Sequence, residues 1–145
     1  MKGISLVEIL ICLLIISCVI VVSPMAGSFI QHKTIERVEA DLRGIVHFAK
    51  SQSLFSGKIL QLSPLSPKQG WAYGIGLYEV GDTQRLLQQW LGYAGNVKIT
   101  WSGFQAKDYV QFSSKLREST ANGYFTITVQ DVSRILVINR LGRIK

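Results

Sequence analysis

Residues 1–24 read MKGISLVEILICLLIISCVIVVSP, and this amino-terminal stretch decides the fold of the chain. Between Ile4 and Val22 the only charged residue is Glu8. At a helical rise of about 1.5 Å per residue, the run from Ile4 to Val22 is about long enough to cross a bilayer core of about 30 Å. The stretch therefore predicts a single membrane-spanning helix.

Glu8 is out of place in such a helix, because a carboxylate inside a bilayer costs roughly 2.5–3.5 kcal/mol on insertion scales. A chain that keeps a carboxylate at this depth is expected to have an interaction partner or a functional role for it. One alternative is a Glu8 near the membrane face that reaches the headgroups. Another is a secretory signal peptide cut between Met25 and Ser28, although its apolar core would be about 7–15 residues, shorter than the run here.

The segment Lys2 to Leu10, KGISLVEIL, resembles the start of the type IV prepilin class. In that class a basic residue and Gly precede a cleavage site, and Glu is the fifth residue of the mature chain. The resemblance implies that a prepilin peptidase cuts between Gly3 and Ile4 and methylates the new amino terminus at Ile4. This chain departs from the family in its short leader and in having Ile where Phe is usual.

The resemblance also implies an assembly role for Glu8. In a pilin filament this Glu is thought to meet the positive amino terminus of a neighbouring subunit, or its own. Physical chemistry agrees, because a buried carboxylate is tolerated when it is paired and helix amino termini favour negative charge. The expected partners are prepilin peptidase, other pilin or pseudopilin subunits and the bacterial inner membrane.

Apolar residues continue at helical spacing beyond the span. Five of them share one face, with steps of three and four residues: Ile35, Val38, Leu42, Ile45 and Ala49. Pro24 and Gly27 predict a kink or a local loss of helix between the apolar and amphipathic halves. Ser56 and Gly57 predict the end of the helix. A helix from Ile4 to Phe55 would be about 78 Å long and would protrude from any small domain.

The rest of the chain is strand-like, with short runs of β-branched and aromatic residues between turn signals. We expect strands at 58–63, 71–80, 86–91, 97–101, 109–113, 124–129 and 134–139. The fold class is α+β, a long helix packed on one antiparallel sheet or two small ones. We expect a leader at 1–3, a transmembrane and filament-core helix at 4–27, an amphipathic helix at 28–57 and a periplasmic β-rich body at 58–145.

Three stretches of this body resemble the GspH/FimT group of minor pilins and pseudopilins. They are the amphipathic segment 41–53, DLRGIVHFAKSQS, the pair Gly70-Trp71 at the start of a strand, and the ending 138–145, INRLGRIK. Members of the group typically carry a helix similar to LRxARSxA and close on a strand followed by a Ser-Gly-Arg type of turn. The resemblance implies a subunit of a type IV pilus or of a type II secretion pseudopilus.

Positive charge gathers in the carboxy-terminal part of the chain. The formal net charge is +7, and residues 85–145 hold nine basic and three acidic side chains. No acid follows Asp131, and a basic ridge is expected at four residues: Arg134, Arg140, Arg143 and Lys145. Such a ridge suits sequence-independent, salt-sensitive binding to a phosphate backbone. The ending 142–145 also resembles the Gly-Arg-x-Arg tail through which some FimT-type pilins bind DNA, with Lys145 replacing the last Arg.

No pattern in the sequence supports catalysis or a cofactor. The two histidines, His32 and His47, have no Cys, Asp or Glu set at metal-ligand spacing. The sequence Gly74-Ile75-Gly76 lacks the third Gly and the helix of a dinucleotide loop. Three functions therefore stay open: a pilus subunit that handles DNA, a type II secretion pseudopilin without DNA binding, and a membrane-anchored binding domain that never polymerises.

Overall fold

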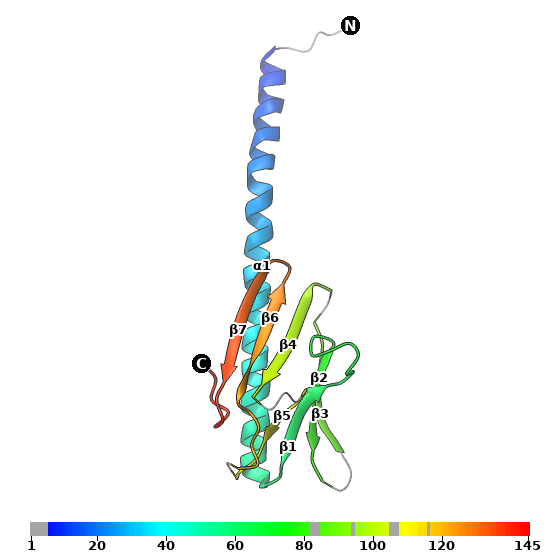
Figure 1. Cartoon of the computed structure of the whole chain (residues 1–145). Helices are drawn as coiled ribbons and strands as arrows, with labels where there is room; N and C mark the ends of the chain where they lie inside the picture. The colour runs from blue at the N-terminus through cyan, green and yellow to red at the C-terminus, as the bar shows by residue number, and fades with distance from the viewer. Residues whose placement is uncertain (1–5, 82–84, 94, 105–107, 116) are drawn as a thin grey trace.

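The computed structural model describes residues 6–81, 85–93, 95–104, 108–115 and 117–145, and it describes the side chains of this set apart from those of 18–29. One helix, α1 (Leu6–Ser56), forms the axis of the molecule, and its amino-terminal half projects beyond the body (Figure 1). It ends at Gly57, whose φ of 66° is the left-handed conformation that glycine tolerates best. The predicted end at Ser56 and Gly57 is confirmed.

The helix is continuous through Pro24 and Gly27, so the predicted loss of helix at these residues is wrong. Figure 1 shows a single rod on both sides of them. A proline removes one backbone hydrogen bond from the ladder and leaves the bonds of the flanking turns in place. Here the turns before and after Pro24 are enough to keep the backbone helical.

Within the described residues, seven strands build the body, and all of them pair antiparallel. The first sheet has the order β3-β2-β1-β5 and the second the order β4-β6-β7. Their bounds are β1 (Leu60–Pro64), β2 (Gly74–Glu79), β3 (Arg85–Leu91), β4 (Val97–Gly103), β5 (Val110–Phe112), β6 (Gly123–Val129) and β7 (Val132–Ile138). The α+β prediction and the seven predicted strands are confirmed, and the structure selects two sheets over one.

The core lies between α1 and the two sheets, because the helix contacts β1 and β5 of the first sheet and β6 and β7 of the second. All five residues of the predicted apolar stripe are buried, which confirms that stripe. From the sheet side, Phe125 is fully buried and its ring lies edge-on to Trp71, with centroids 5.0 Å apart. Strand β2 carries the Gly74-Ile75-Gly76 sequence, so this stretch is a strand and not a dinucleotide loop.

Candidate assembly and nucleic-acid interfaces

Over residues 6–17, the projecting part of α1 presents an exposed and mainly apolar surface. Of the residues 6–17, Leu6 is 75% exposed, Leu14 65% and Leu10 58%. Exposed apolar side chains on all sides of a single helix are not stable in water, so this segment requires lipid or other helices around it. The geometry therefore makes the projecting helix an interaction element.

Glu8 is the one charged residue on this exposed segment, and it forms no ion pair with any residue that the structure describes. The predicted processing residues Gly3 and Ile4 lie outside the described residues. Across the described part of the chain, no helical stretch meets the length and apolarity needed to cross a membrane. Half of the predicted span at 4–27 falls on residues whose side chains are not described, namely 4–5 and 18–27.

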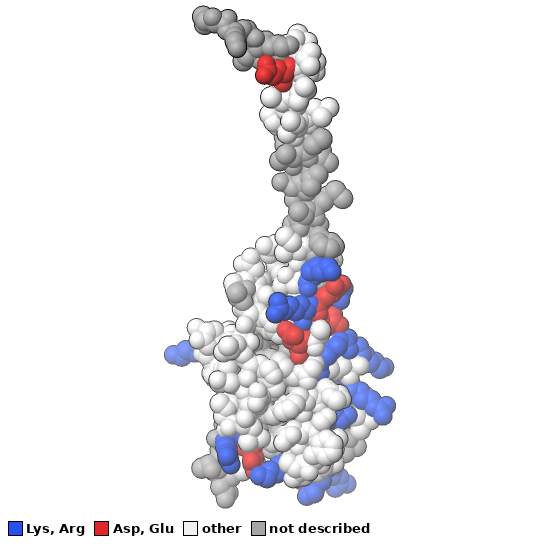
Figure 2. Space-filling model, turned by 180° about the vertical axis from the view of Figure 1, so that it is seen from behind, with Lys and Arg blue, Asp and Glu red and all other residues white. Residues whose placement is uncertain are grey.

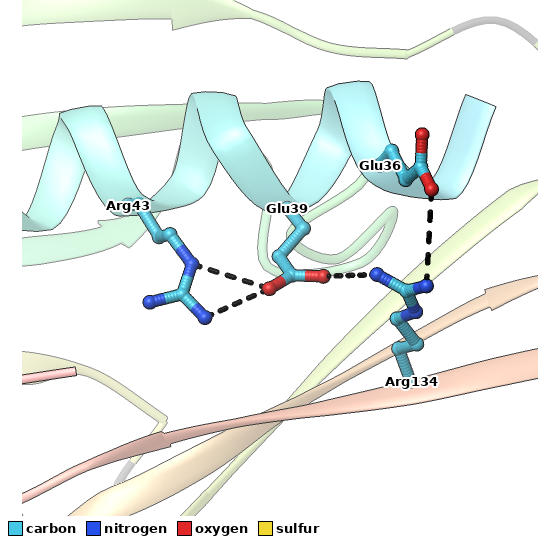
Figure 3. Close-up of polar contacts among 4 residues, drawn as sticks. All are labelled: Glu36, Glu39, Arg43 and Arg134. Atoms are coloured by element: carbon cyan, nitrogen blue, oxygen red, sulfur yellow. Dashed lines mark hydrogen bonds and ion pairs between the residues drawn. The ribbon is translucent and has the colours of Figure 1, made fainter. Parts of the chain in front are cut away.

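Strand β7 is tied to α1 by an ionic network (Figure 3). Arg134 donates from Nη1 to Glu39 Oε2 at 2.9 Å and lies 4.0 Å from Glu36. Arg43 donates from Nη2 to the other oxygen of Glu39 at 2.8 Å. These bonds with Arg43 and then Arg134 hold the pKa of Glu39 below its ordinary value. Arg134, a predicted phosphate contact, therefore has its guanidinium directed at helix carboxylates.

The carboxy-terminal tail folds back on β7 instead of continuing in an extended line. Asn139 Oδ1 accepts hydrogen bonds from the backbone N–H groups of Leu141 (3.0 Å) and Arg143 (2.8 Å). Gly142 completes the turn with a φ of 67°, and Ile144 then forms an antiparallel bridge with Ile138. The turn gives the tail a fixed position on the body.

The tail presents three exposed basic side chains, Arg140, Arg143 and Lys145. None of them forms an ion pair with a residue in the described ranges, in contrast to Arg134. Figure 2 shows Lys and Arg along the edge of the body where Figure 1 places β7 and the C terminus. The structure thus brings three of the four predicted phosphate contacts to one end of β7 and leaves Arg134 within the strand.

A groove between α1 and the tail adds basic residues that sequence reasoning missed. Arg43, His47 and Lys50 line the helix side of this groove and Arg143 lines the tail side. The helix residues stand at i, i+4 and i+7, so they share a helix face. This spacing is visible in the sequence and predicts a basic helix face. The sequence does not show that the tail folds back against that face of α1.

A second polar contact joins the helix to the first sheet. The hydroxyl of Tyr93 donates to Asp41 Oδ2 at 3.3 Å. Burial, and then the nearby Asp41 carboxylate, raise the pKa of Tyr93, so the phenol stays protonated and remains a donor at neutral pH. The described residues hold no group of three or more His, Cys, Asp or Glu side chains that could bind a metal.

Two solved structures share this architecture. Both are crystal structures of the type IV minor pilin FimU of Pseudomonas aeruginosa strain PAO1, in space groups P21 and P65. The first superposes with a TM-score of 0.60 at 19% identity, covering 81% of this chain and 90% of that one. The second superposes with a TM-score of 0.56 at 19% identity, covering 76% and 90%. At this identity the likeness establishes a shared fold.

Sequence comparison gives the family. No curated protein sequence matches the chain significantly. The family model described as type II transport protein GspH matches residues 40–142, which is most of the chain. Pilins and pseudopilins of this class are structural proteins and not enzymes, and they interact with other pilin subunits. The protein therefore belongs to the GspH family and has the fold of a type IV minor pilin.

Proposed function

We propose that the chain is a minor pilin or pseudopilin that waits in the inner membrane and enters a filament through its amino-terminal helix. In this proposal residues 1–3 are a leader, 4–27 the membrane and filament-core helix, 28–57 the amphipathic helix and 58–145 the periplasmic body. The observation that most directly supports this proposal is the exposed apolar surface of residues 6–17. This surface needs lipid before assembly and neighbouring helices after it.

Processing is the first step of the proposed pathway. Prepilin peptidase removes residues 1–3 by cutting between Gly3 and Ile4, and the new amino terminus at Ile4 is methylated. Glu8 then stands five residues into the mature chain and meets a positive amino terminus in the filament core. The lack of an ion-pair partner for Glu8 among the described residues supports a partner from another subunit.

The experiment compares wild type with Glu8→Leu and Glu8→Asp in cells that assemble the filament. Mass spectrometry of membrane fractions reports removal of residues 1–3, and sheared filaments report incorporation. We expect Glu8→Leu to be processed and to stay in the membrane without entering filaments, whereas Glu8→Asp keeps partial incorporation. Wild-type incorporation of Glu8→Leu would show that Glu8 is not needed for assembly, whereas absence of the wild-type chain itself from filaments would favour a plain single-span anchor.

DNA binding at the carboxy-terminal tail is a second candidate function, suited to a pilus that takes up DNA. The supporting observation is that Arg140, Arg143 and Lys145 are exposed, close in the chain and without ion-pair partners among the described residues. A type II secretion pseudopilin without DNA binding is the alternative. Titrating fluorescent DNA with the wild type and with the triple change of these residues to Ala, at two salt concentrations, separates the two.

A further inference from the structure

We infer that the DNA site has two walls, with Arg43, His47 and Lys50 of α1 facing Arg143 of the tail, and that a DNA phosphate backbone lies between them. This inference rests on the proposed DNA binding and adds the helix to it. It makes the amphipathic half of α1 part of a ligand site as well as part of the core. Its carrying feature is the groove between the helix and the folded-back tail.

The groove has a volume of about 790 Å³. Its lining combines basic groups with small and aliphatic side chains: Arg43, Gly44, His47, Lys50, Ser51, Leu54, Gly142, Arg143 and Ile144. No carboxylate is among these described residues. A concave, basic and carboxylate-free surface concentrates positive potential where an anion can enter.

The two walls are held together by direct packing. A Cβ atom placed on Gly142 would lie 3.1 Å from Cδ of Lys50, so the methylene stem of Lys50 rests against the turn of the tail. Long basic side chains commonly pack their methylene stem in this way and keep the ammonium in solvent. Since Arg143 follows Gly142 directly, this contact sets the position of Lys50 relative to Arg143.

The basic side chains that line the groove differ in whether they already form an ion pair. Lys50 and Arg143 form no ion pair within the described residues. Arg43 is engaged with Glu39 through Nε and Nη2, which leaves Nη1 for a ligand. Lys50 and Arg143 are therefore expected to contribute most of the affinity, with Arg43 and His47 adding hydrogen bonds.

The lining also indicates how DNA is recognised. No Phe, Tyr or Trp side chain lines the groove, and its one ring is the imidazole of His47, so bases have little stacking surface there and contacts go mainly to phosphates. From Arg43 to Lys50 the helix rises about 10.5 Å, which corresponds to roughly three base pairs at 3.4 Å of rise along the axis of a DNA duplex. A strand that follows α1 can therefore place successive phosphates beside these residues. Binding of this kind is independent of sequence and weakens with salt.

The test measures binding of a short fluorescent duplex by anisotropy, with full-length protein in a non-ionic detergent and a series of salt concentrations. The variants are Lys50→Gln for the helix wall, Arg143→Gln for the tail wall and Lys98→Gln as control. Lys98 is exposed on β4, at the opposite edge of its sheet from β7. We expect both groove variants to bind several-fold more weakly and to lower the salt slope by about one each. Lys98→Gln keeps wild-type binding.

The possible results distinguish failure of the two-wall site from failure of DNA binding itself. Absence of wild-type binding at every salt concentration overturns DNA binding itself, and binding to anionic vesicles alone would replace DNA with a membrane surface. If Arg143→Gln weakens DNA binding while Lys50→Gln binds as well as Lys98→Gln, the tail binds DNA without the helix. The proposed helix wall is then wrong. Wild-type binding by Lys50→Arg, in contrast to Lys50→Gln, would support a contact made by charge. Unchanged tryptophan fluorescence confirms that each variant is folded.

Discussion

Arg134 Nη1 lies 2.9 Å from Glu39 Oε2, and this contact joins the last strand of the body to the helix across 95 residues of sequence. The other oxygen of Glu39 accepts from Arg43, so both oxygens of one half-buried carboxylate are engaged. A guanidinium on each side lowers the pKa of Glu39 by favouring its charged form. The contact thereby makes the stability of the body dependent on pH.

The first prediction concerns that dependence. Because the pKa of Glu39 is lower in the folded state than its ordinary value of 4.5, its contribution is complete above that pH and is lost as pH falls through the folded-state pKa. Glu39→Gln is expected to destabilise the body at pH 7 by about 0.5–1 kcal/mol, as the pairs are partly exposed. Urea unfolding of the full chain in detergent, at pH 7 and pH 3, measures the free energy of unfolding of the wild type and of Glu39→Gln.

Glu36→Gln is the matched control, three residues away on the same helix. Its carboxylate is 58% exposed and lies 4.0 Å from Arg134, so we expect little change at either pH. The loss in Glu39→Gln should shrink as the pH falls below 4.5, because protonation of the wild-type carboxylate then removes the charge that Arg43 and Arg134 stabilise. An equal loss for both variants would contradict the role assigned to Glu39.

The sequence predicts most of this fold because the signals are local. The apolar stripe on α1 and the seven strands follow from periodicity and turn residues, and all were found in place. The division into two sheets was not predictable, because strand β5 pairs with β1 and not with its chain neighbours β4 or β6. Such non-local pairing depends on packing against the helix and leaves no periodic signal in the chain.

The candidate site was predictable only in part, for the same reason. Arg134 was grouped with the tail residues by its charge, but its partner Glu39 is far away in sequence. The basic ridge was predicted from charge alone, and in the structure Asn139 and Gly142 turn the tail back on β7. Both turn residues are visible in the sequence. That the turn places Arg143 beside Lys50 depends on the packing of the whole body.

A second prediction tests the core beneath β7. Leu136 is 1% exposed and Ile135, its neighbour in the same strand, is 64% exposed. Leu136→Ala should destabilise the body by about 2–5 kcal/mol, since it removes buried methyl groups and leaves a cavity. Ile135→Ala should cost less than about 1 kcal/mol. Chemical denaturation followed by tryptophan fluorescence compares the two, and similar losses would mean that β7 packs differently.

A third prediction concerns the turn glycine of the tail. Gly142→Ala introduces a Cβ at a φ of 67°, 3.1 Å from Lys50 and 3.2 Å from Phe112. The conformation alone costs about 1–2 kcal/mol, and the crowding adds to it. Gly81→Ala is the control, because apart from its chain neighbours no described atom lies within 4 Å of its added Cβ. Because this turn is at the end of the chain, we expect the strain to appear as faster hydrogen exchange at Arg143 in Gly142→Ala only, and unchanged exchange would refute the tight turn.

The last prediction tests whether Asn139 fixes the tail locally. Asn139→Ala removes the acceptor for the N–H groups of Leu141 and Arg143, which costs about 0.5–1.5 kcal/mol for each bond. The affected backbone is at the end of the chain, so the loss should appear as opening of the tail and not as unfolding of the body. We expect faster hydrogen exchange at Leu141 and Arg143 and faster trypsin cleavage after Arg140 and Arg143.

Asn96→Ala provides the comparison, because Asn96 is exposed beside another glycine turn and its side chain forms no hydrogen bond within the described residues. It should leave exchange and cleavage in the tail unchanged. If Asn139→Ala behaves in the same way, the bridge between Ile138 and Ile144 holds the tail without the side chain of Asn139. If exchange instead rises throughout β6 and β7, the tail is part of the cooperative unit of the second sheet, and its basic residues are positioned by the stability of the whole body.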